Sequence, residues 1–388
     1  MVHRTCALVL LLGGLALGQA PEPISAPPRL ADAVGDPLPG GATARMGTLR
    51  WRHGGSVHFV GFLAEGRELV SAGLDGWIRV WEVPSGREVR RWQWYKAGVI
   101  DDDGYESVNP TIRSIALSAD RRFLAASLPN GRVQVWNIKG GEERAFGAKL
   151  GRPFHGRNGI AFSPDGKTLA TRGDDHVTRL WDLRTGKELY QLHPPRETKD
   201  LGSISFYGGM GNTLAFAPDG RTLAAMNPWN TEQGKGCVIL HEAETGKELR
   251  RIEGGDNSRS GRLAFGPGIL AVAWGDRETK LYDPETGKVL RSLGEPKSDV
   301  IIHALAFSPD GKMVATRSAS STPTIQIWET ATGKKVGELG DLFLTENQNV
   351  FLRPGGPGSS SMPIDFAPDG KRIAEATGGQ VVRMWDVK

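Results

Sequence analysis

The sequence has few of the residues that build disulfides and metal sites. It contains 2 cysteines in 388 residues, so a disulfide framework, a cysteine-based four-ligand zinc site and a Cys-X-X-Cys redox pair are all excluded by number. Cys6 lies in an N-terminal apolar stretch, which leaves Cys237 as the one cysteine of a processed chain. Lysine and arginine form no long run, and the formal net charge of +4 is spread along the chain. We therefore expect no nucleic-acid partner.

Sequence motifs of common catalytic sites are missing as well. The sequence has no Gly-X-Ser-X-Gly, His-Glu-X-X-His or Gly-X4-Gly-Lys-Ser/Thr segment, and its many glycines fit turns. The histidines are spread along the chain with no shared metal-ligand spacing. We therefore expect no catalytic residue, no metal site and no cofactor.

The first eighteen residues have the features of a signal peptide. Arg4 supplies a positive charge, the run from residue 6 to 18 is almost entirely apolar, and small residues end it at Gly18. This run is shorter than the roughly 20 residues that a membrane-spanning helix needs. We expect residues 1–18 to direct export to the periplasm or the extracellular space and to be cleaved near Gly18. An uncleaved anchor and a helix packed on the domain are the alternatives.

Two further segments follow the signal peptide. Residues 19–43 are rich in proline, glycine and alanine with little periodicity, which predicts a flexible linker. Over residues 44–388 one unit recurs seven times, most clearly as AFSPDGKTLATRGDDHVTRLWDLRTGKELYQL from 161 to 192. Its alternating apolar positions and hairpin-length turns predict four short antiparallel strands per unit.

The end of the third strand is the clearest marker of each copy. The residues at this position are Trp81, Trp136, Trp181, His241, Tyr282, Trp328 and Trp385. Their shortest separations fit the ~40–45 residues of a four-stranded propeller blade, and the longer ones fit that unit plus an insertion. With Trp181-Asp182, Trp385-Asp386 and Asp75 before Trp81, the chain resembles the WD-repeat family. The resemblance implies an all-β, seven-bladed β-propeller.

The family resemblance also implies buried hydrogen-bonded side chains in each blade. The first copy matches the family's set completely, with His53, Ser71, Asp75 and Trp81. The third copy keeps part of it, with Thr171, Asp175 and Trp181. The other copies are degenerate, so we expect their aromatic residues, Trp136, Trp328 and Trp385 among them, to be held by apolar packing.

The seventh copy ends at Lys388, directly after its third strand. An unpaired third strand would leave an exposed sheet edge, which proteins normally cover. The segment from Thr48 to Trp51 alternates like a fourth strand. We expect it to pair with the strand ending at Trp385 and so to close the ring, as WD-repeat propellers commonly do.

The insertions between strands are unevenly distributed. The turns after the first and third strands are short in nearly every copy, whereas the long insertions follow the second and fourth strands. In a propeller these two groups lie on opposite faces, and loops on a rigid scaffold commonly bind ligands. The sequence therefore predicts a binding face formed by the insertions at 92–110, 193–211, 227–236 and 340–361.

Six residues of this face are candidates for contact with a partner. Trp94 and Tyr95 are aromatic residues of the type enriched at binding hot spots, and three carboxylates, Asp101, Asp102 and Asp103, follow them. Trp229 lies between Pro228 and Asn230, either as a plug of its own loop or as a contact residue. A solvated acidic loop and a Ca²⁺ site are alternatives for the carboxylates.

The function expected from the sequence is that of a non-enzymatic scaffold that binds a protein partner outside the cytoplasm. The alternative is a propeller that binds a carbohydrate or another small ligand, or is a hydrolase, at its central pocket. That alternative requires polar and carboxylate side chains from at least three blades to converge near the axis.

Overall fold

In the residues that it describes, the computed structural model has 27 strands in seven antiparallel sheets. It describes the residues 50–83, 85–94, 114–127, 133–140, 143–146, 159–172, 177–192, 213–230, 235–254, 261–274, 279–294, 302–318, 324–340, 363–376 and 379–387. The predicted signal peptide and linker lie outside these residues. Within the described part of the chain, no helix is of the length and hydropathy that a membrane span requires.

The first three sheets follow the predicted copies. Sheet 1 contains β1 (Val57–Phe62), β2 (Glu68–Gly73), β3 (Trp77–Glu82) and β4 (Glu88–Gln93), with a 3-10 turn at Ala64–Gly66. Sheet 2 contains β5 (Ser114–Leu117), β6 (Phe123–Ser127), β7 (Val133–Asn137) and β8 (Glu143–Phe146). Sheet 3 contains β9 (Gly159–Phe162), β10 (Thr168–Arg172), β11 (Thr178–Asp182) and β12 (Glu188–Leu192).

The remaining four sheets repeat the same order. Sheet 4 contains β13 (Leu214–Phe216), β14 (Thr222–Asn230), β15 (Lys235–Glu242) and β16 (Glu248–Glu253). Sheet 5 contains β17 (Gly261–Gly266), β18 (Ile269–Trp274), β19 (Thr279–Tyr282) and β20 (Val289–Leu293). Sheet 6 contains β21 (Ile302–Phe307), β22 (Met313–Ser318), β23 (Ile325–Glu329) and β24 (Lys335–Leu339), and sheet 7 contains β25 (Ile364–Phe366), β26 (Arg372–Ala376) and β27 (Val382–Asp386).

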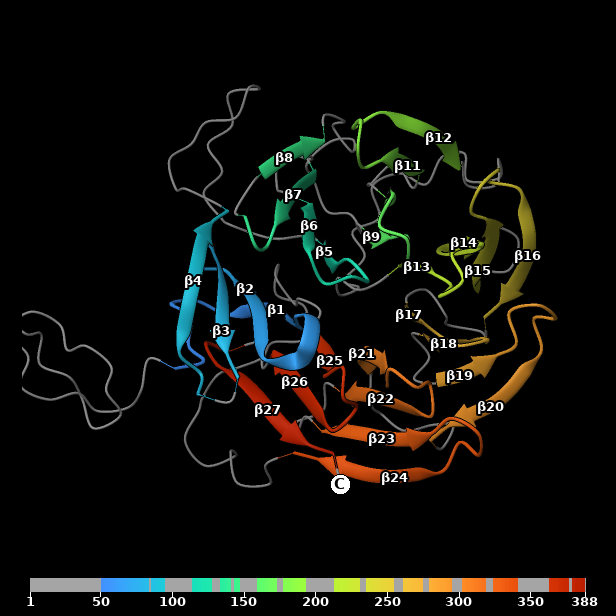
Figure 1. Cartoon of the computed structure of the whole chain (residues 1–388). Coiled ribbons are helices and arrows are strands. Elements are labelled where there is room, and N and C mark those ends of the chain that lie inside the picture. The colour runs from blue at the N-terminus through green and yellow to red at the C-terminus, as the bar shows by residue number, and fades with distance from the viewer. Residues whose placement is uncertain are drawn as a thin grey trace, which may run out of the picture. The chain divides into compact units, whose positions relative to one another are not determined.

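The seven sheets are the blades of a β-propeller. The first strand of each sheet is innermost and the last strand is outermost (Figure 1). Most strands have three to six residues, and a partly buried position lies between two buried ones at the start of third strands such as Thr279–Tyr282, with the pattern BiBB. The all-β, seven-bladed prediction is confirmed.

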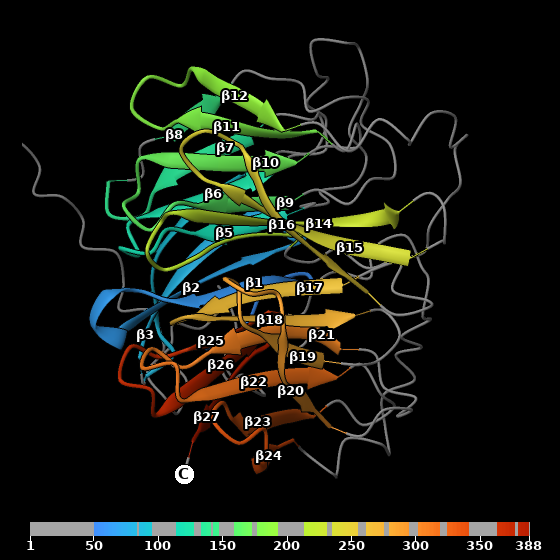
Figure 2. The same ribbon diagram turned by 90° about the vertical axis from the view of Figure 1, so that its right-hand side faces the viewer.

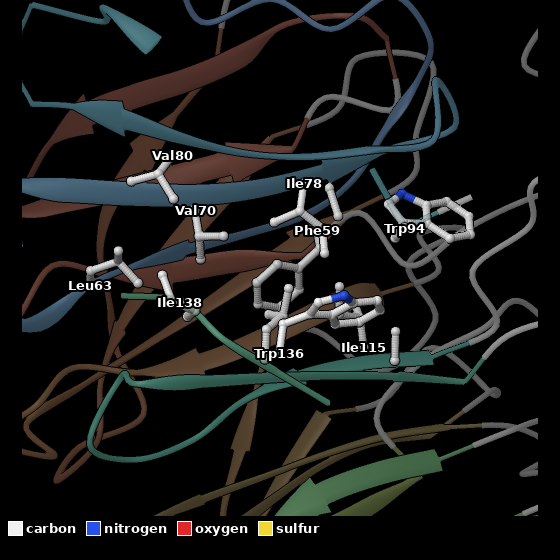
Figure 3. Close-up of a cluster of buried hydrophobic side chains, with 12 residues drawn as sticks. Phe59, Leu63, Val70, Ile78, Val80, Trp94, Ile115, Trp136 and Ile138 are labelled. Atoms are coloured by element: carbon white, nitrogen blue, oxygen red, sulfur yellow. The ribbon is translucent and has the colours of Figure 1, made fainter. Parts of the chain in front are cut away.

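The core is divided into seven apolar clusters, and each lies between two neighbouring blades. Figure 3 shows the cluster between blades 1 and 2, where Phe59 and Val70 face Ile115 and Trp136. The last cluster joins blade 7 to blade 1 and contains Val60 and Ala374. Because each blade uses both of its faces in this way, the ring is held together chiefly by burial of apolar surface.

The ring closes where blade 7 meets the N-terminal segment. Arg52 forms an antiparallel bridge with Val381, the amide of Val382 donates to the carbonyl of Trp51 (2.9 Å), and the amide of His53 donates to the carbonyl of Gln380 (2.8 Å). Trp51 also packs against the cluster between blades 7 and 1. The contact of Trp51 with the third strand of blade 7 agrees with the predicted closure, whereas Thr48 lies outside the described residues.

Candidate binding face

The antiparallel registers define two faces of the propeller. Val57 pairs with Gly73 and Trp77 pairs with Gln93, so one face carries the starts of first and third strands together with the ends of second and fourth strands. On the opposite face, the connections within blades range from two residues (267–268) to six (283–288). On the first face, residues 94–113 join β4 to β5, 193–213 join β12 to β13, and 340–363 join β24 to β25. We call the first face, with the long connections, the long-loop face, and the opposite face the short-turn face.

The insertion in blade 4 extends a hairpin. β14 continues to Asn230, and β15 begins at Lys235. These two residues pair after an irregularity in register. Figure 2 shows both strands projecting past their neighbours on the long-loop face. The predicted loop 227–236 is therefore largely a strand extension, and Trp229 lies within β14; its side chain is outside the described residues.

The structure corrects the prediction for Trp94. Its side chain is 8% exposed and belongs to the apolar cluster between blades 1 and 2 (Figure 3). Its amide donates to the carbonyl of Gly76 (2.9 Å), and its Nε1 donates to the carbonyl of Gly73 (3.3 Å). A ring held in this way extends the core of the blade and offers little surface to a partner. Tyr95 and the carboxylates of Asp101, Asp102 and Asp103 lie outside the described residues.

The predicted hydrogen-bonded set of the first blade is present. His53 Nε2 lies 2.7 Å from Ser71 Oγ, and Trp81 Nε1 donates to the same oxygen at 2.7 Å. His53 Nδ1 lies 3.0 Å from Asp75 Oδ1, and Asp75 also accepts from Arg79 at 2.9 Å. The set ties the segment after the N-terminal bridge to the second and third strands of the blade.

The other aromatic residues have different partners. Trp181 Nε1 donates to Thr171 at 2.7 Å, as predicted, whereas Asp175 lies outside the described residues. Trp328 Nε1 donates to Thr316 (2.9 Å) and Trp385 Nε1 donates to Glu375 (3.0 Å), so packing alone does not hold these two rings. Trp136 Nε1 is buried and has no hydrogen-bond partner in the described part of the chain.

A polar cluster on the long-loop side of blades 5 to 7 was not predicted from the sequence. Arg262 Nε donates to the backbone carbonyl of His303 (3.1 Å), and Arg317 Nε donates to Glu375 Oε1 (2.6 Å). Burial and, to a lesser extent, the charges of Arg262 and Arg317 lower the pKa of His303 to about 4. His303 is thus neutral at pH 7. The sequence signal for this cluster is a charged residue at a position of a strand that otherwise faces the core, such as Glu375 in the segment RIAEA.

A second histidine occupies the matching position of blade 1. Val57 and Phe59 flank a register irregularity at His58, just as Ile302 and Ala304 flank one at His303. Bulges of this kind re-aim side chains and are common next to functional sites. Burial lowers the pKa of His58 to about 4, so it is also neutral at pH 7. Within the described ranges, no three histidine, cysteine or carboxylate side chains are grouped so that they could hold a metal ion.

Comparison with known proteins agrees with the repeat pattern. The family model "WD domain, G-beta repeat" matches residues 46–82, 153–182 and 287–329. The chain is 28% identical over 207 residues to "Periodic tryptophan protein 2" of Arabidopsis thaliana, which covers 51% of this chain and 19% of that protein. It is 23% identical over 298 residues to "Serine-threonine kinase receptor-associated protein" of Gallus gallus, covering 77% of this chain and 73% of that protein.

A third relative has a similar level of identity. The "Guanine nucleotide-binding protein subunit beta" of Zea mays is 26% identical over 227 residues, which cover 55% of this chain and 52% of that protein. The chain thus spans less than two thirds of the Arabidopsis and maize relatives. The seven sheets and the matched segments lead to one conclusion: the chain is a seven-bladed β-propeller, and three of its segments match the WD-repeat family model.

Proposed function

We propose that this propeller is a non-enzymatic scaffold that binds a protein partner through its long-loop face. The observation that carries the proposal is the one-sided placement of the long connections on a ring of rigid blades. Short turns of two to six residues cover the opposite face in every blade, whereas three connections of the long-loop face have at least 20 residues. The printed names of two relatives, a receptor-associated protein and a subunit of a larger assembly, support the same class of function.

Site-specific photo-crosslinking tests the choice of face. A photoreactive amino acid placed at Gly254 or Gly340 lies at a strand end on the long-loop face, and one placed at Lys187 or Lys334 lies in a turn of the short-turn face. We expect covalent adducts in the native cell from the first pair only. Adducts from the second pair, with none from the first, contradict the proposed face while leaving the fold unaffected.

We further propose that the scaffold acts outside the cytoplasm. The support is the N-terminal sequence, in which Arg4 precedes an apolar run that ends at Gly18. N-terminal sequencing of the mature protein, combined with cell fractionation, tests this. A mature chain that begins near Gln19 in an exported fraction supports the proposal, and a chain that keeps residues 1–18 in the cytoplasm contradicts it.

A second candidate function is binding of a small polar ligand near the axis. The polar cluster favours it, because Arg262, His303 and Glu375 come from three successive blades. The guanidinium group of Arg262 suits a ligand with an anionic group, such as an acidic sugar, because it can donate two parallel hydrogen bonds. A thermal-shift screen against acidic and neutral glycans tests it. A saturable shift that Arg262→Gln abolishes supports this candidate, and the absence of any shift contradicts it.

A further inference from the structure

Two residues break the internal repeat of the propeller on its short-turn face. One equivalent position of the first strands holds a small residue in six blades. In the seventh blade this position holds Asp365, which pairs with Ala374 of the second strand. The six small residues are Gly61, Ala116, Ala161, Ala215, Ala264 and Ala306. A carboxylate has therefore replaced a methyl group or a hydrogen at one position of the ring.

The second departure is in the turn between β5 and β6. Arg121 has a φ of 60°, and its amide donates to the carbonyl of Ser118. Five other blades have a glycine with the same hydrogen bond and a φ between 65° and 73°, namely Gly66, Gly166, Gly220, Gly311 and Gly370. A left-handed conformation is strained for a residue that carries a Cβ atom. A turn residue without another role would be glycine here, as it is elsewhere in this chain.

The two departures contact each other. Arg121 Nη1 lies 2.5 Å from Asp365 Oδ2, and Nη2 lies 3.4 Å from Oδ1. The negative charge of Asp365 raises the pKa of Arg121 above its ordinary value. Asp365 and Arg121 are separated by 244 residues in the sequence. Two unrelated exceptions to a sevenfold pattern would not be expected to meet in this way unless each requires the other.

The backbone of Phe62 completes the arrangement. β1 is the inner edge strand of its sheet. The amide of Leu63 donates to the carbonyl of Glu68. Because backbone hydrogen bonds to the neighbouring strand alternate along an antiparallel pair, the N–H and C=O of the preceding residue, Phe62, point away from β2. Asp365 Oδ2 accepts from the Phe62 amide (2.8 Å), and Arg121 Nη1 donates to the Phe62 carbonyl (3.1 Å). An edge-strand residue thus has both of its backbone polar groups satisfied by side chains from the two flanking blades.

We propose that Arg121, Asp365 and the backbone of Phe62 form a latch that holds the ring closed at the seam between blades 7 and 1. This seam is the one join between neighbouring blades that are not consecutive in the chain. The N-terminal segment closes its outer side by pairing with β27, the outermost described strand of blade 7. The latch closes the inner side, where β25 faces β1, and anchors both blades to blade 2.

The direction in which one substitution changes the rate of ring opening distinguishes a latch from an ordinary turn residue. Arg121→Gly relieves the left-handed strain, so it slows opening of the ring if Arg121 has no other role. If the latch holds the seam, the same substitution accelerates opening, because the Phe62 carbonyl and Asp365 lose a charged partner. Asp365→Ala likewise restores the residue of the other blades and removes the acceptor of the Phe62 amide.

Hydrogen–deuterium exchange of the full chain provides the measurement. We expect exchange in a peptide spanning Phe62 to rise about tenfold or more in either single variant, as loss of a hydrogen bond to a charged group implies. In the double variant, exchange should be no faster than in the faster single variant, because the two residues act as one unit. Peptides of β14, on the far side of the ring, should be unchanged.

Matched variants make the outcome decisive. Arg122→Ala alters the next residue of the same turn, whose guanidinium lies over the Phe123 ring, and should leave exchange at Phe62 at the wild-type rate. Asp365→Asn keeps an oxygen for the Phe62 amide but loses the charge, so it serves as the milder variant if Asp365→Ala does not fold. Slower or unchanged exchange in Arg121→Gly overturns the latch, as do single-variant effects that multiply in the double variant.

Discussion

The Nε atom of Arg317 lies 2.6 Å from Oε1 of Glu375, and both side chains are buried between blades 6 and 7, with exposed fractions of 1% and 6%. The other oxygen of Glu375 accepts the hydrogen bond of Trp385 Nε1 at 3.0 Å. Glu375 occupies the position at which Ser71, Thr171 and Thr316 hold the tryptophans of their own blades. The carboxylate of Glu375 therefore accepts the tryptophan hydrogen bond that a hydroxyl accepts in the other blades, and it also forms an ion pair with Arg317 of the neighbouring blade.

The first prediction concerns this pair. Glu375→Thr keeps a hydroxyl for Trp385 but removes the carboxylate from a buried guanidinium, and breaking a buried ion pair costs about 3–5 kcal/mol. We expect a loss of this size in urea-induced unfolding. The double variant Arg317→Met and Glu375→Thr uses residues that the chain has at the same positions in blades 4 and 3, Met226 and Thr171. It should recover most of the stability, and an equal loss in both variants would contradict the assignment.

The second prediction concerns the unpaired ring of blade 2. Leu124 pairs with Trp136 as Leu69 pairs with Trp81, so Ala126 stands at the position of Ser71. The missing hydroxyl explains why Trp136 Nε1 has no partner in the described residues. We expect Ala126→Ser to raise the free energy of unfolding by about 0.5–1.5 kcal/mol, the net value of a hydrogen bond.

A change of the partner provides the control for this gain. Trp136→Phe removes the indole N–H, so the serine at 126 should no longer stabilise the chain in that background. The measurement is the difference in unfolding midpoint between matched pairs with Ala or Ser at position 126. A gain that persists with phenylalanine at 136 would show that the serine stabilises the blade by some other contact.

Much of this fold could be predicted from the sequence, because its signals are local and repeated. The turn SPDG, the alternation that ends at Trp181 and the return turn define a blade within about thirty residues, and the chain repeats that unit seven times. The partners of Trp81 could also be predicted, since the first copy contains the whole set of His53, Ser71 and Asp75. These predictions depend on patterns within one blade.

The contacts between blades could not be predicted in the same way. Glu375 and Arg317 are 58 residues apart in the sequence, and no period of the repeat brings them together. Trp94 looks like a loop residue because it follows the last strand of blade 1, yet the neighbouring blade covers it. Burial at such positions depends on how two sheets pack, and a single copy of the repeat carries no information about its neighbour.

The third prediction concerns Asp75 at acidic pH. Burial alone would raise the pKa of Asp75, but its hydrogen bonds with His53, Arg79 and the Gly54 amide hold the pKa below its ordinary value. A carboxylate of this kind stabilises the fold above its unfolded pKa of about 4, and the contribution decreases as the pH falls below that value. We expect Asp75→Asn to cost about 2 kcal/mol at pH 7.

The difference between Asp75→Asn and the wild type should shrink progressively as the pH is lowered from 4 to 2. Chemical denaturation over this range measures it. Asp219→Asn provides the control, because Asp219 is exposed in the turn between β13 and β14 and accepts from the backbone amide of Arg221. That variant should differ little from the wild type at any pH, and a constant deficit of Asp75→Asn down to pH 2 would contradict the prediction.

The fourth prediction concerns the two bulged histidines, whose pH window differs from that of Asp75. Burial lowers the pKa of His58 from 6.5 to about 4, and burial with the charges of Arg262 and Arg317 does the same for His303. Between pH 6.5 and 4 the unfolded chain binds protons that the folded chain does not, so stability must fall as the pH falls through this range. A shift of this size corresponds to a loss on the order of 3 kcal/mol for each histidine at pH 4.

Glutamine at either position removes the titrating group and should flatten the stability profile between pH 6.5 and 4. The profile of the double variant should be flatter than that of either single variant, because the histidines lie in different blades and titrate independently. Asp75→Asn should retain the full wild-type slope in this window, since its effect begins below pH 4. A slope that survives in the double glutamine variant would mean that other groups cause the acid sensitivity and that these histidines can be protonated within the folded ring.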